Sequence, residues 1–359
     1  MRVDGSLPRG EPARVILAAA AAGLVALLVG AAANAVGPVE GPTAAVMARL
    51  APRSLLLGVA TLPGGNLVAV GERGHVLVSA DAGASWGQSP APTSSTLTAV
   101  HFVDATHGWA VGHDEAILRT EDGGRSWELR HWAPERQQPL LGIWFDAAGH
   151  GVAVGAFATV YRSADGGRSW TSAAFEPQPL VLPHAAAKAR AVDPMADDEG
   201  ITQPHLNAIA GDERGRLYIA AEAGRLYRSD DGGTHWRVLR SPYPGSFFGV
   251  LPLGGDVLLA YGLRGHLFRS EDAGLSWSKV DSGTEALLSG GVRLADGTVA
   301  IVGLAGVVLV SHDGAHSFRR VQLPNRKGLA AVAAVPGGLV VVGDGGATRL
   351  PLTALVPGG

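Results

Sequence analysis

The strongest constraint on the fold is an eight-residue pattern that recurs along the chain at a nearly fixed interval. Its third copy is SADGGRSW, from Ser163 to Trp170, and the general form is Ser/Thr-x-Asp-x-Gly-x-x-Trp. Five more copies begin at Ser79, Thr120, Ser229, Ser270 and Ser311. The aromatic residues that close the six copies are 41, 43, 66, 41 and 41 residues apart. A period of about 40 to 45 residues is the length of one four-stranded propeller blade, so the repeat predicts a β-propeller.

Each residue type in the pattern suits a tight turn between two strands. The Asp carboxylate and the Ser or Thr hydroxyl can accept hydrogen bonds from nearby backbone N–H groups, and glycine takes positive φ without strain. The Trp buries a large apolar area beside the turn. We expect the sixth turn to be looser, because Ala315 replaces the glycine and Phe318 the Trp. The predicted structural residues of the six turns are Asp81 and Trp86, Asp122 and Trp127, Asp165 and Trp170, Asp231 and Trp236, Asp272 and Trp277, and Asp313 and Phe318.

A shorter pattern that recurs seven times sets the number of blades at seven. Each repeat opens with a small residue followed by Val or Ile, from Gly58-Val59 to Ala331-Val332, with Gly291-Val292 as the sixth instance. Small side chains fit the innermost strand of a blade, where neighbouring strands crowd a central axis. The predicted fold is therefore all-β, a seven-bladed β-propeller of four-stranded antiparallel blades over residues 55–355. The predicted blades are 55–95, 96–138, 139–180, 205–245, 246–285, 286–327 and 328–355.

The seventh repeat ends without the Asp turn and the outer strand that follows it. An unfinished blade would expose a strand edge, which proteins usually cover. The segment before blade one, residues 37–54, is a linker that contains the stretch Ala44 to Ala51. We predict that this stretch closes the ring as the outer strand of blade seven.

The N-terminal 36 residues have the features of an export signal. Arg2, Arg9 and Arg14 precede an uncharged run over residues 15–36, which ends in the small-residue triplet Ala33-Asn34-Ala35. This pattern is typical of a cleaved signal peptide, but the run is also long enough to be retained as a hydrophobic helix anchored in the membrane. Both alternatives predict an exported protein, in a periplasm or thylakoid-lumen equivalent. A retained helix would tether it to the inner membrane.

Composition and charge narrow the possible functions. The net charge of −3 gives no basic field for a nucleic-acid partner. The chain has no cysteine, which excludes disulfides, thiolate metal sites and a cysteine nucleophile, and its 12 histidines are scattered. We therefore predict no catalytic residue, no metal and no small-molecule cofactor.

Blade topology indicates which end of the ring carries a partner-binding face. Residues 176–204 form an insertion between blades three and four, and long insertions in compact folds are often functional. The connection from an outer strand to the next inner strand lies at the same end as the turn between strands two and three. The candidate face comprises Arg73, His113, Asp114, Glu115, Phe157, Lys188, Arg190, Arg225 and Arg264.

Several other polar residues recur at equivalent blade positions, which favours a structural role over ligand binding. Arginine precedes the Ser or Thr of the Asp turn in four repeats, and we expect it to pair with an acidic residue or to stack on an adjacent Trp. His75 and His266 share one blade position, and Tyr161 and Tyr227 share another. The recurring arginines are Arg119, Arg162, Arg228 and Arg269.

The SADGGRSW-type copies resemble the Asp-box or BNR repeats of sialidases, sortilin-like receptors and some glycosidases. Seven blades, the order V-G-x-x-G and then R-S-x-D-G-G-x-S-W, and an exported N-terminus are most similar to the photosystem II assembly and stability factor family and its bacterial relatives. The resemblance covers nearly all of residues 50–350. It implies a monomeric, non-enzymatic propeller that uses an arginine-rich patch to hold a membrane protein or its precursor, such as a photosystem or transporter subunit.

The alternative function is a periplasmic or secreted glycoside hydrolase of the sialidase-like Asp-box class. Such an enzyme needs a cluster of three arginines, a tyrosine paired with a glutamate, and a separate acid. A sialidase of this class usually has six blades and an early Arg-Ile-Pro motif, which this chain does not contain. A glycosidase that uses two carboxylates of the central channel stays open as an alternative.

Overall fold

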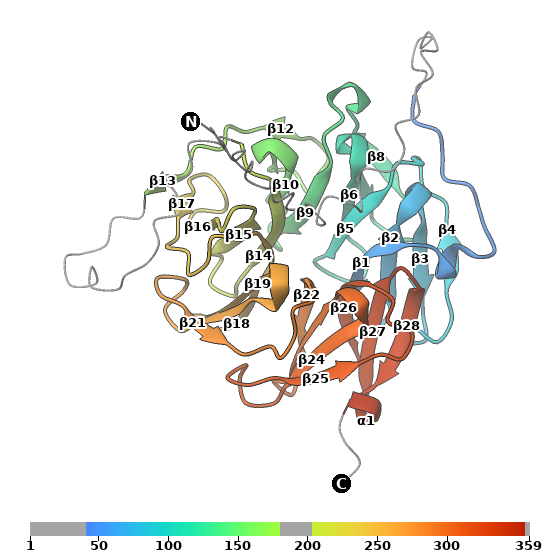
Figure 1. Ribbon diagram of the computed structural model, residues 1–359. Coiled ribbons are helices and arrows are strands. Elements are labelled where there is room, and N and C mark those ends of the chain that lie inside the picture. Colours follow the sequence, from blue (N-terminus) through green and yellow to red (C-terminus); the bar gives the residue numbers. More distant parts are fainter. Residues whose placement is uncertain (1–40, 180–202, 356–359) are drawn as a thin grey trace, which may run out of the picture. The chain divides into compact units, whose positions relative to one another are not determined.

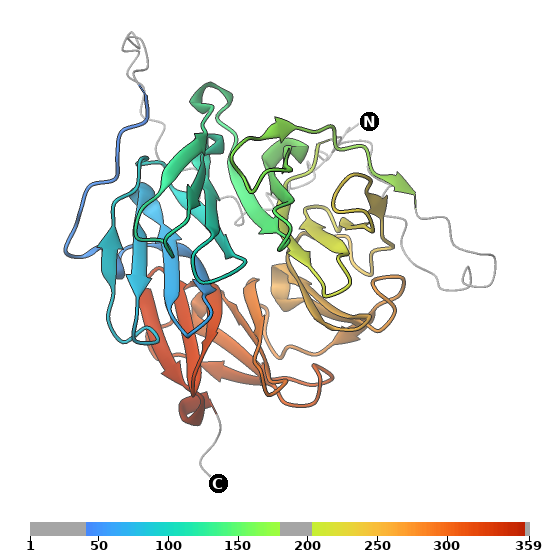
Figure 2. The same cartoon turned by 180° about the vertical axis from the view of Figure 1, so that it is seen from behind.

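The protein forms a ring of seven β-sheets, which confirms the predicted seven-bladed propeller of antiparallel blades (Figures 1 and 2). The computed structural model describes residues 41–179 and 203–355. The predicted signal peptide or anchor and most of the insertion, with Lys188 and Arg190, lie outside the described residues. In the described ranges no helix has both the length and the apolar character that crossing a bilayer requires.

The strands follow one another from the axis to the rim of each blade. Blades one to three comprise β1 (Leu56–Thr61), β2 (Leu67–Gly71), β3 (Val76–Ser79) and β4 (Gly87–Ser89); β5 (Leu97–Phe102), β6 (Gly108–Gly112), β7 (Ile117–Thr120) and β8 (Glu128–His131); and β9 (Leu140–Phe145), β10 (Gly151–Gly155), β11 (Val160–Ser163) and β12 (Thr171–Ser172). Blades four and five comprise β14 (Leu206–Gly211), β15 (Leu217–Ala221), β16 (Leu226–Ser229) and β17 (Arg237–Val238), with β13 (Gln178–Pro179) added; and β18 (Phe247–Gly254), β19 (Val257–Gly262), β20 (Leu267–Ser270) and β21 (Ser278–Val280). Blades six and seven comprise β22 (Leu288–Arg293), β23 (Val299–Gly303), β24 (Val307–Ser311) and β25 (Arg319–Gln322); and β26 (Leu329–Val335), β27 (Gly338–Gly343) and β28 (Gly346–Pro351), followed by α1 (Leu352–Leu355).

The innermost strands close the ring around the axis. Each contacts the inner strand of the next blade, and β26 returns to contact β1. A Cβ added to Gly58 would lie 3.1 Å from the Cα of Ala99, so a larger side chain would force the two strands apart. In blade six the equivalent position is Gly290, because Gly290 pairs with Val302 as Gly58 pairs with Val70. The predicted alignment of that blade on Gly291 was therefore displaced by one residue.

The six Asp turns share one hydrogen-bond network, as the repeated sequence predicts. In the first turn the Ser79 hydroxyl donates to Asp81 Oδ1 at 2.8 Å and accepts from the Gly83 N–H at 2.8 Å. The same carboxylate accepts the Ser85 N–H at 2.9 Å and the Ser85 hydroxyl at 2.5 Å. Gly83 has φ 84°, and its added Cβ would lie 2.5 Å from Val340 Cγ2 in blade seven. Glycine is therefore required there both by the backbone conformation and by the neighbouring blade.

The sixth turn keeps this network despite its substitutions. Ala315 has φ 67° and its N–H donates to the Ser311 hydroxyl at 3.0 Å, while the Ser317 N–H donates to Asp313 Oδ1 at 3.1 Å. The prediction of a looser turn is wrong, because the Ser and Asp side chains impose the backbone conformation even on an alanine. A left-handed non-glycine residue costs about 1 kcal/mol, which the buried hydrogen bonds offset.

Blade seven has three strands in the described part of the chain, and residues 44–51 do not complete it. The Ala45 N–H donates to the Ala91 carbonyl at 3.0 Å, and the Gln88 amide bonds both the Ala48 N–H and the Val46 carbonyl. This segment therefore lies beside β4 of blade one, and the predicted ring-closing strand is wrong. The Gln88 side chain of blade one therefore bonds backbone groups of this segment that pairing with blade seven would otherwise have bonded. The 3₁₀ turn η1 (Ala51–Arg53) then packs against β28 near Gly346.

The start of the insertion crosses from blade three to blade four. Gln178 and Pro179 pair in parallel with Arg237 and Val238, which makes blade four a five-stranded sheet. Phe175 reaches the same blade and contacts the ring of Tyr227 edge-on at 4.9 Å. The insertion is thus attached to the outer edge of blade four where it begins.

We predict that acid destabilises the ring through the Asp turns. The Ser85 hydroxyl and N–H lower the pKa of Asp81 to about 2, and the Ser169 hydroxyl and N–H do the same for Asp165. Because these folded-state pKa values lie below the ordinary value of 3.8, the stabilisation is complete above about pH 4 and is lost as the pH falls through 2. Urea unfolding followed by tryptophan fluorescence between pH 7 and pH 2 measures this loss. A free energy of unfolding that stayed constant below pH 4 would contradict it.

Candidate partner-binding face

The turns between strands two and three all lie at one end of the ring, together with the connections between blades. The His113 N–H donates to the Thr96 carbonyl, the Ala156 N–H to the Pro139 carbonyl and the Glu222 N–H to the His205 carbonyl. Each bond joins such a turn to the connection that enters the same blade. This end of the ring, called the turn face below, is the face on which the candidate residues were expected. Five of the turns are the 3₁₀ segments η2 (Glu72–Gly74), η3 (His113–Glu115), η5 (Ala156–Ala158), η7 (Leu263–Gly265) and η8 (Leu304–Gly306), and the turn of blade four is residues 222–224.

In blades one to six the middle residue of the turn takes a left-handed backbone conformation. The six residues are Arg73, Asp114, Phe157, Ala223, Arg264 and Ala305, with φ between 53° and 59°. None is glycine, although this conformation costs a side chain about 1 kcal/mol. The bonds to the blade connections hold the turn in place, so the tip residue varies while the backbone stays the same.

Four of the predicted face residues lie at or near the surface at these tips. Arg73 and Arg264 are exposed, and Phe157 is 48 % exposed with its ring 4.9 Å from that of His205. Asp114 is half-buried and accepts a hydrogen bond from the Ser95 hydroxyl at 2.6 Å. His113, at the start of its turn, is also half-buried.

Two predicted face residues are buried and do not belong to the exposed surface. Arg225 is 4 % exposed because it follows the turn glycine and points inward at the start of β16, the position that His75 and His266 occupy in their blades. Glu115 is fully buried with φ 51°, at the position that glycine occupies in four other blades. The sequence shows Glu115 as the charged residue at a position that is glycine in those blades and alanine (Ala158) in blade three, which was the signal for a special role.

Glu115 is the centre of a buried polar cluster between blades two and three. Its carboxylate accepts the Tyr161 hydroxyl at 2.6 Å, lies 3.2 Å from His131 Nε2, and lies 3.6 Å from Nη1 of Arg136. Arg136 belongs to η4 (Pro134–Arg136), a 3₁₀ turn in the connection between these blades. Burial and the hydrogen bond to Glu115 raise the pKa of Tyr161 to about 12. The cluster fastens the connection of residues 132–139 to the turn of blade two.

The cluster lacks the geometry of the hydrolase alternative. Tyr161 and Glu115 form a tyrosine–glutamate pair, but both are buried between blades and a raised tyrosine pKa opposes nucleophile formation. The ion pairs of Glu115 in the described ranges involve one arginine, not three. The described residues also contain no group of three side chains suited to a metal ion.

Exposed cations gather on one part of the turn face. Arg73 and Arg264 are the tips of blades one and five, and three more exposed cations lie in the connections into blades one and seven. None of the five forms an ion pair with a carboxylate in the described part of the chain. We call this set the cationic arc: Arg53, Arg73, Arg264, Arg326 and Lys327. The tips of blades two to four are Asp114, Phe157 and Ala223, so the cations occupy the blades from five round to one.

The opposite end of the ring carries the Asp turns, and the arginines that precede two of these turns bond the neighbouring blade. Arg119 donates from Nε to the Gly166 carbonyl at 2.7 Å, and Arg269 donates from Nε to the Gly314 carbonyl at 3.0 Å. Each bond joins a third strand to the Asp turn of the next blade. Arg119 also pairs with Glu121 and Arg269 with Glu271, as predicted for a structural role.

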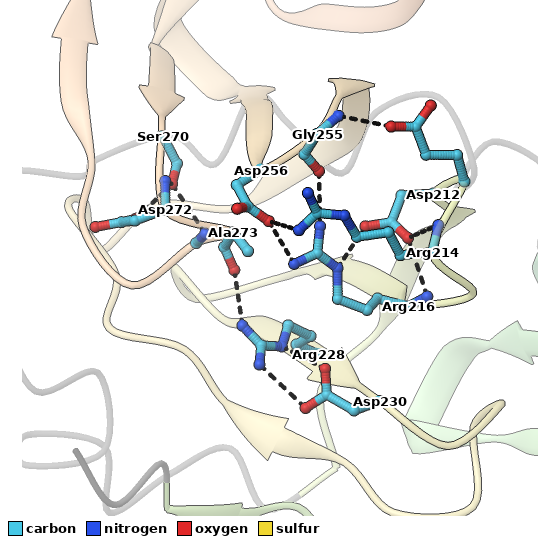
Figure 3. Close-up of polar contacts among 12 residues, drawn as sticks. Asp212, Arg214, Arg216, Arg228, Asp230, Gly255, Asp256, Ser270, Asp272 and Ala273 are labelled. Atoms are coloured by element: carbon cyan, nitrogen blue, oxygen red, sulfur yellow. Dashed lines mark hydrogen bonds and ion pairs between the residues drawn. The ribbon is translucent and has the colours of Figure 1, made fainter. Parts of the chain in front are cut away.

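Blades four and five are joined on this end by a denser ion network (Figure 3). Arg216 donates to Asp212 Oδ2 at 2.6 Å, to Asp256 Oδ1 at 2.7 Å and to the Gly255 carbonyl at 2.7 Å. Arg214 reaches the same Asp256 oxygen at 2.8 Å, and Arg228 bonds the Ala273 carbonyl at 3.3 Å. The close-up shows these side chains directed toward the neighbouring blade. The donors of Arg214, Arg216 and Arg228 are thus used between blades.

Comparisons with known proteins support the resemblance seen in the sequence. Residues 78–247, just under half of the chain, match a family model described as Photosynthesis system II assembly factor YCF48. The chain is 44 % identical over 61 residues to the chloroplastic photosystem II stability/assembly factor HCF136 of Cyanidioschyzon merolae, covering 16 % of this chain and 14 % of that one. It is 40 % identical over 45 residues to the photosystem II assembly protein Ycf48 of Thermosynechococcus vestitus, covering 12 % and 13 %. The aligned segments thus span about a seventh of these two relatives.

Solved structures share the fold over most of their length. A YCF48 bound to a D1 peptide matches with a TM-score of 0.63 at 17 % identity, covering 87 % of this chain and 99 % of that one. YCF48 from Cyanidioschyzon merolae matches with a TM-score of 0.60 at 16 % identity, covering 82 % and 94 %. Virginiamycin B lyase from Staphylococcus aureus also matches with a TM-score of 0.63, at 11 % identity and the same coverage of 82 % and 94 %. Because an enzyme shares the architecture equally well, the fold alone does not decide the function.

We predict that the ion network between blades four and five stabilises the ring through its buried member. Asp212 is 2 % exposed and Arg216 is 14 % exposed, so the change Arg216→Met leaves a buried carboxylate without its partner. We expect the free energy of unfolding to fall by about 3 kcal/mol. Arg214→Met is the matched control, because Arg214 bonds the same Asp256 but is 55 % exposed, and it should cost less than about 1 kcal/mol. Urea unfolding of both variants measures the difference, and equal losses would contradict the assignment.

Proposed function

We propose that this chain, which resembles the photosystem II assembly factor family in sequence and in fold, is a non-enzymatic docking scaffold for a membrane protein or its precursor. The family match and the two curated relatives support an assembly role. A structurally similar YCF48 has a D1 peptide bound, which supports a polypeptide ligand over a small molecule. The described residues supply no metal cluster and no accessible tyrosine–glutamate pair on which to base a hydrolase.

The observation that carries this proposal is the cationic arc on the turn face. Its five cations are exposed, and in the described part of the chain none has a carboxylate partner, whereas Arg119, Arg216 and Arg269 of the opposite end are used between blades. Free arginine side chains recognise carboxylates through paired hydrogen bonds. A cavity of about 460 Å³ lies beside Arg264 and is also lined by His266, Lys279 and Glu285. The ligand favoured by this surface is an acidic segment of a polypeptide chain.

The proposed location is outside the cytoplasm. The basic start, the uncharged run of residues 15–36 and the small-residue triplet support export, followed by cleavage or by retention as an anchor. In the periplasm or in a lumen, the scaffold would meet the exported loops and termini of membrane proteins. The chain therefore has access to the clients that its resemblance implies.

The cationic arc makes a direct prediction for client capture. The double variant Arg73→Glu and Arg264→Glu should weaken binding by about tenfold, because two charge reversals remove roughly 1.4 kcal/mol of attraction. Immobilised protein is incubated with detergent-solubilised membranes of its host, and retained membrane proteins are quantified by mass spectrometry. Thermal unfolding is measured alongside, since both side chains are exposed and the ring should remain intact.

Arg125→Glu is the matched control, because it makes the same charge change on an exposed arginine of the Asp-turn end. We expect this variant to capture membrane proteins as well as the unmodified protein. Equal capture by the double variant would overturn the assignment of the arc. If the unmodified protein retains no membrane protein and turns over a glycoside, the hydrolase function would replace the scaffold function proposed here.

A further inference from the structure

We propose that the outer edge of β28 in blade seven is a second docking surface, which binds an extended acidic polypeptide segment by strand addition. In the other six blades this edge of the third strand is covered by a fourth strand. Across residues 41–179 and 203–355, β28 has no strand beside it, and residues 44–51 lie against blade one instead. An open edge offers a row of backbone donors and acceptors, and this is the feature that strand addition uses.

The register of the hairpin shows which backbone groups point outward. The Leu352 N–H donates to the Gly337 carbonyl at 3.0 Å, and the pairing continues from Pro351 opposite Gly338 to Gly346 opposite Gly343. In an antiparallel ladder, bonded and non-bonded pairs alternate. Thr348 and Leu350 therefore bond to β27, while the N–H and C=O of Ala347 and Arg349 face away from it.

These outward groups are available in the described part of the chain. Neither the Ala347 nor the Arg349 N–H donates to the backbone of another element. Thr348, Arg349 and Pro351 are exposed, and η1 lies against the Gly346 end of the strand. An incoming antiparallel strand can make four backbone hydrogen bonds, two with Ala347 and two with Arg349. Pro351 has no N–H and ends the pairing.

The charge of the edge indicates the chemistry of the partner. Arg349 donates from Nη2 to the Pro336 carbonyl at 3.2 Å and forms no ion pair with a described carboxylate. An acidic side chain on the incoming strand would pair with it across the ladder. A second copy of this chain fits less well, because a two-fold pairing of β28 would place two Arg349 side chains on the same face. An acidic peptide in extended form is therefore the favoured occupant.

The ring itself provides an example of strand addition. On blade four, Gln178 and Pro179 pair in parallel with β17, outside the four strands of the repeat. The outer edge of a blade in this protein thus accepts an additional extended segment. The open edge of blade seven is longer, because β28 has six residues and β17 has two. This inference uses none of the cationic arc and does not depend on the proposed function.

The test uses the full chain and a synthetic acetylated octapeptide, TVEVTVES, with TVKVTVKS as the charge-reversed control. We expect the acidic peptide to bind and to slow hydrogen exchange of the Ala347 and Arg349 amides at least tenfold by NMR. The amides of Thr348 and Leu350 should already exchange slowly, because they bond to β27. Failure of the acidic peptide to protect the two outward amides would overturn the proposal.

Ala347→Pro is the decisive variant, because it removes an outward N–H and no bond of the hairpin. It should weaken acidic-peptide binding at least tenfold in fluorescence anisotropy, while Ala347→Val, which keeps the N–H, binds normally. Arg349→Glu leaves the backbone unchanged and should bind the lysine peptide more tightly than the acidic peptide. This variant tests the proposal even if the proline variant folds poorly. Unchanged peptide preference in Arg349→Glu, or equal binding by a folded Ala347→Pro, would overturn it.

Two other occupants of the edge would be recognised in the same experiments. Slow exchange of the Ala347 and Arg349 amides before any peptide is added would mean that another segment of this chain covers β28. A dimer in analytical ultracentrifugation that dissociates on Ala347→Pro would mean that a second copy does so. Either result would overturn the proposed peptide site.

Discussion

The fold depends on the hydrogen bonds that the Asp carboxylate of each Asp turn accepts from the backbone of that same turn. In each Asp turn the Ser or Thr hydroxyl accepts the N–H of the turn glycine, or of Ala315 in the sixth turn, and the Asp carboxylate bonds the N–H and the side chain of the residue two positions further on. The turn then has one conformation, and the aromatic residue that closes it packs between blades. The turn glycine also contacts the preceding blade of the ring, as the approach of Gly83 in blade one to Val340 in blade seven shows. A local hydrogen-bond network thereby sets the spacing between neighbouring sheets.

The features that the sequence predicted well are those with a local cause. The Asp turns, the small residues of the inner strands and the arginines that precede the turns all depend on neighbours at fixed offsets, so their spacing identified them. Gly291 was chosen one residue too late because blade six has two adjacent glycines, and the second of them precedes Val292.

The features that the sequence did not predict depend on partners far along the chain. Residues 44–51 had two possible edges to lie against, and the Gln88 side chain decides between them. Arg225 looked like a surface residue because it lies next to a turn, but it begins a strand and points inward. Glu115 was assigned to the same face, and its burial depends on His131 of the same blade, Tyr161 of the next blade and Arg136 of the connection between them. The repeat spacing alone does not predict which residues make these contacts.

The left-handed tips of the turn face have a consequence for how this surface can change. Their backbone is held by bonds to the adjoining connections, so one geometry carries four different side chains at the six tips Arg73, Asp114, Phe157, Ala223, Arg264 and Ala305. Substitutions at these six residues would change the chemistry of the turn face and leave the β-sheets of the blades unchanged. The ring thus keeps its backbone fixed while these six side chains can be exchanged, so new binding specificity can evolve one residue at a time.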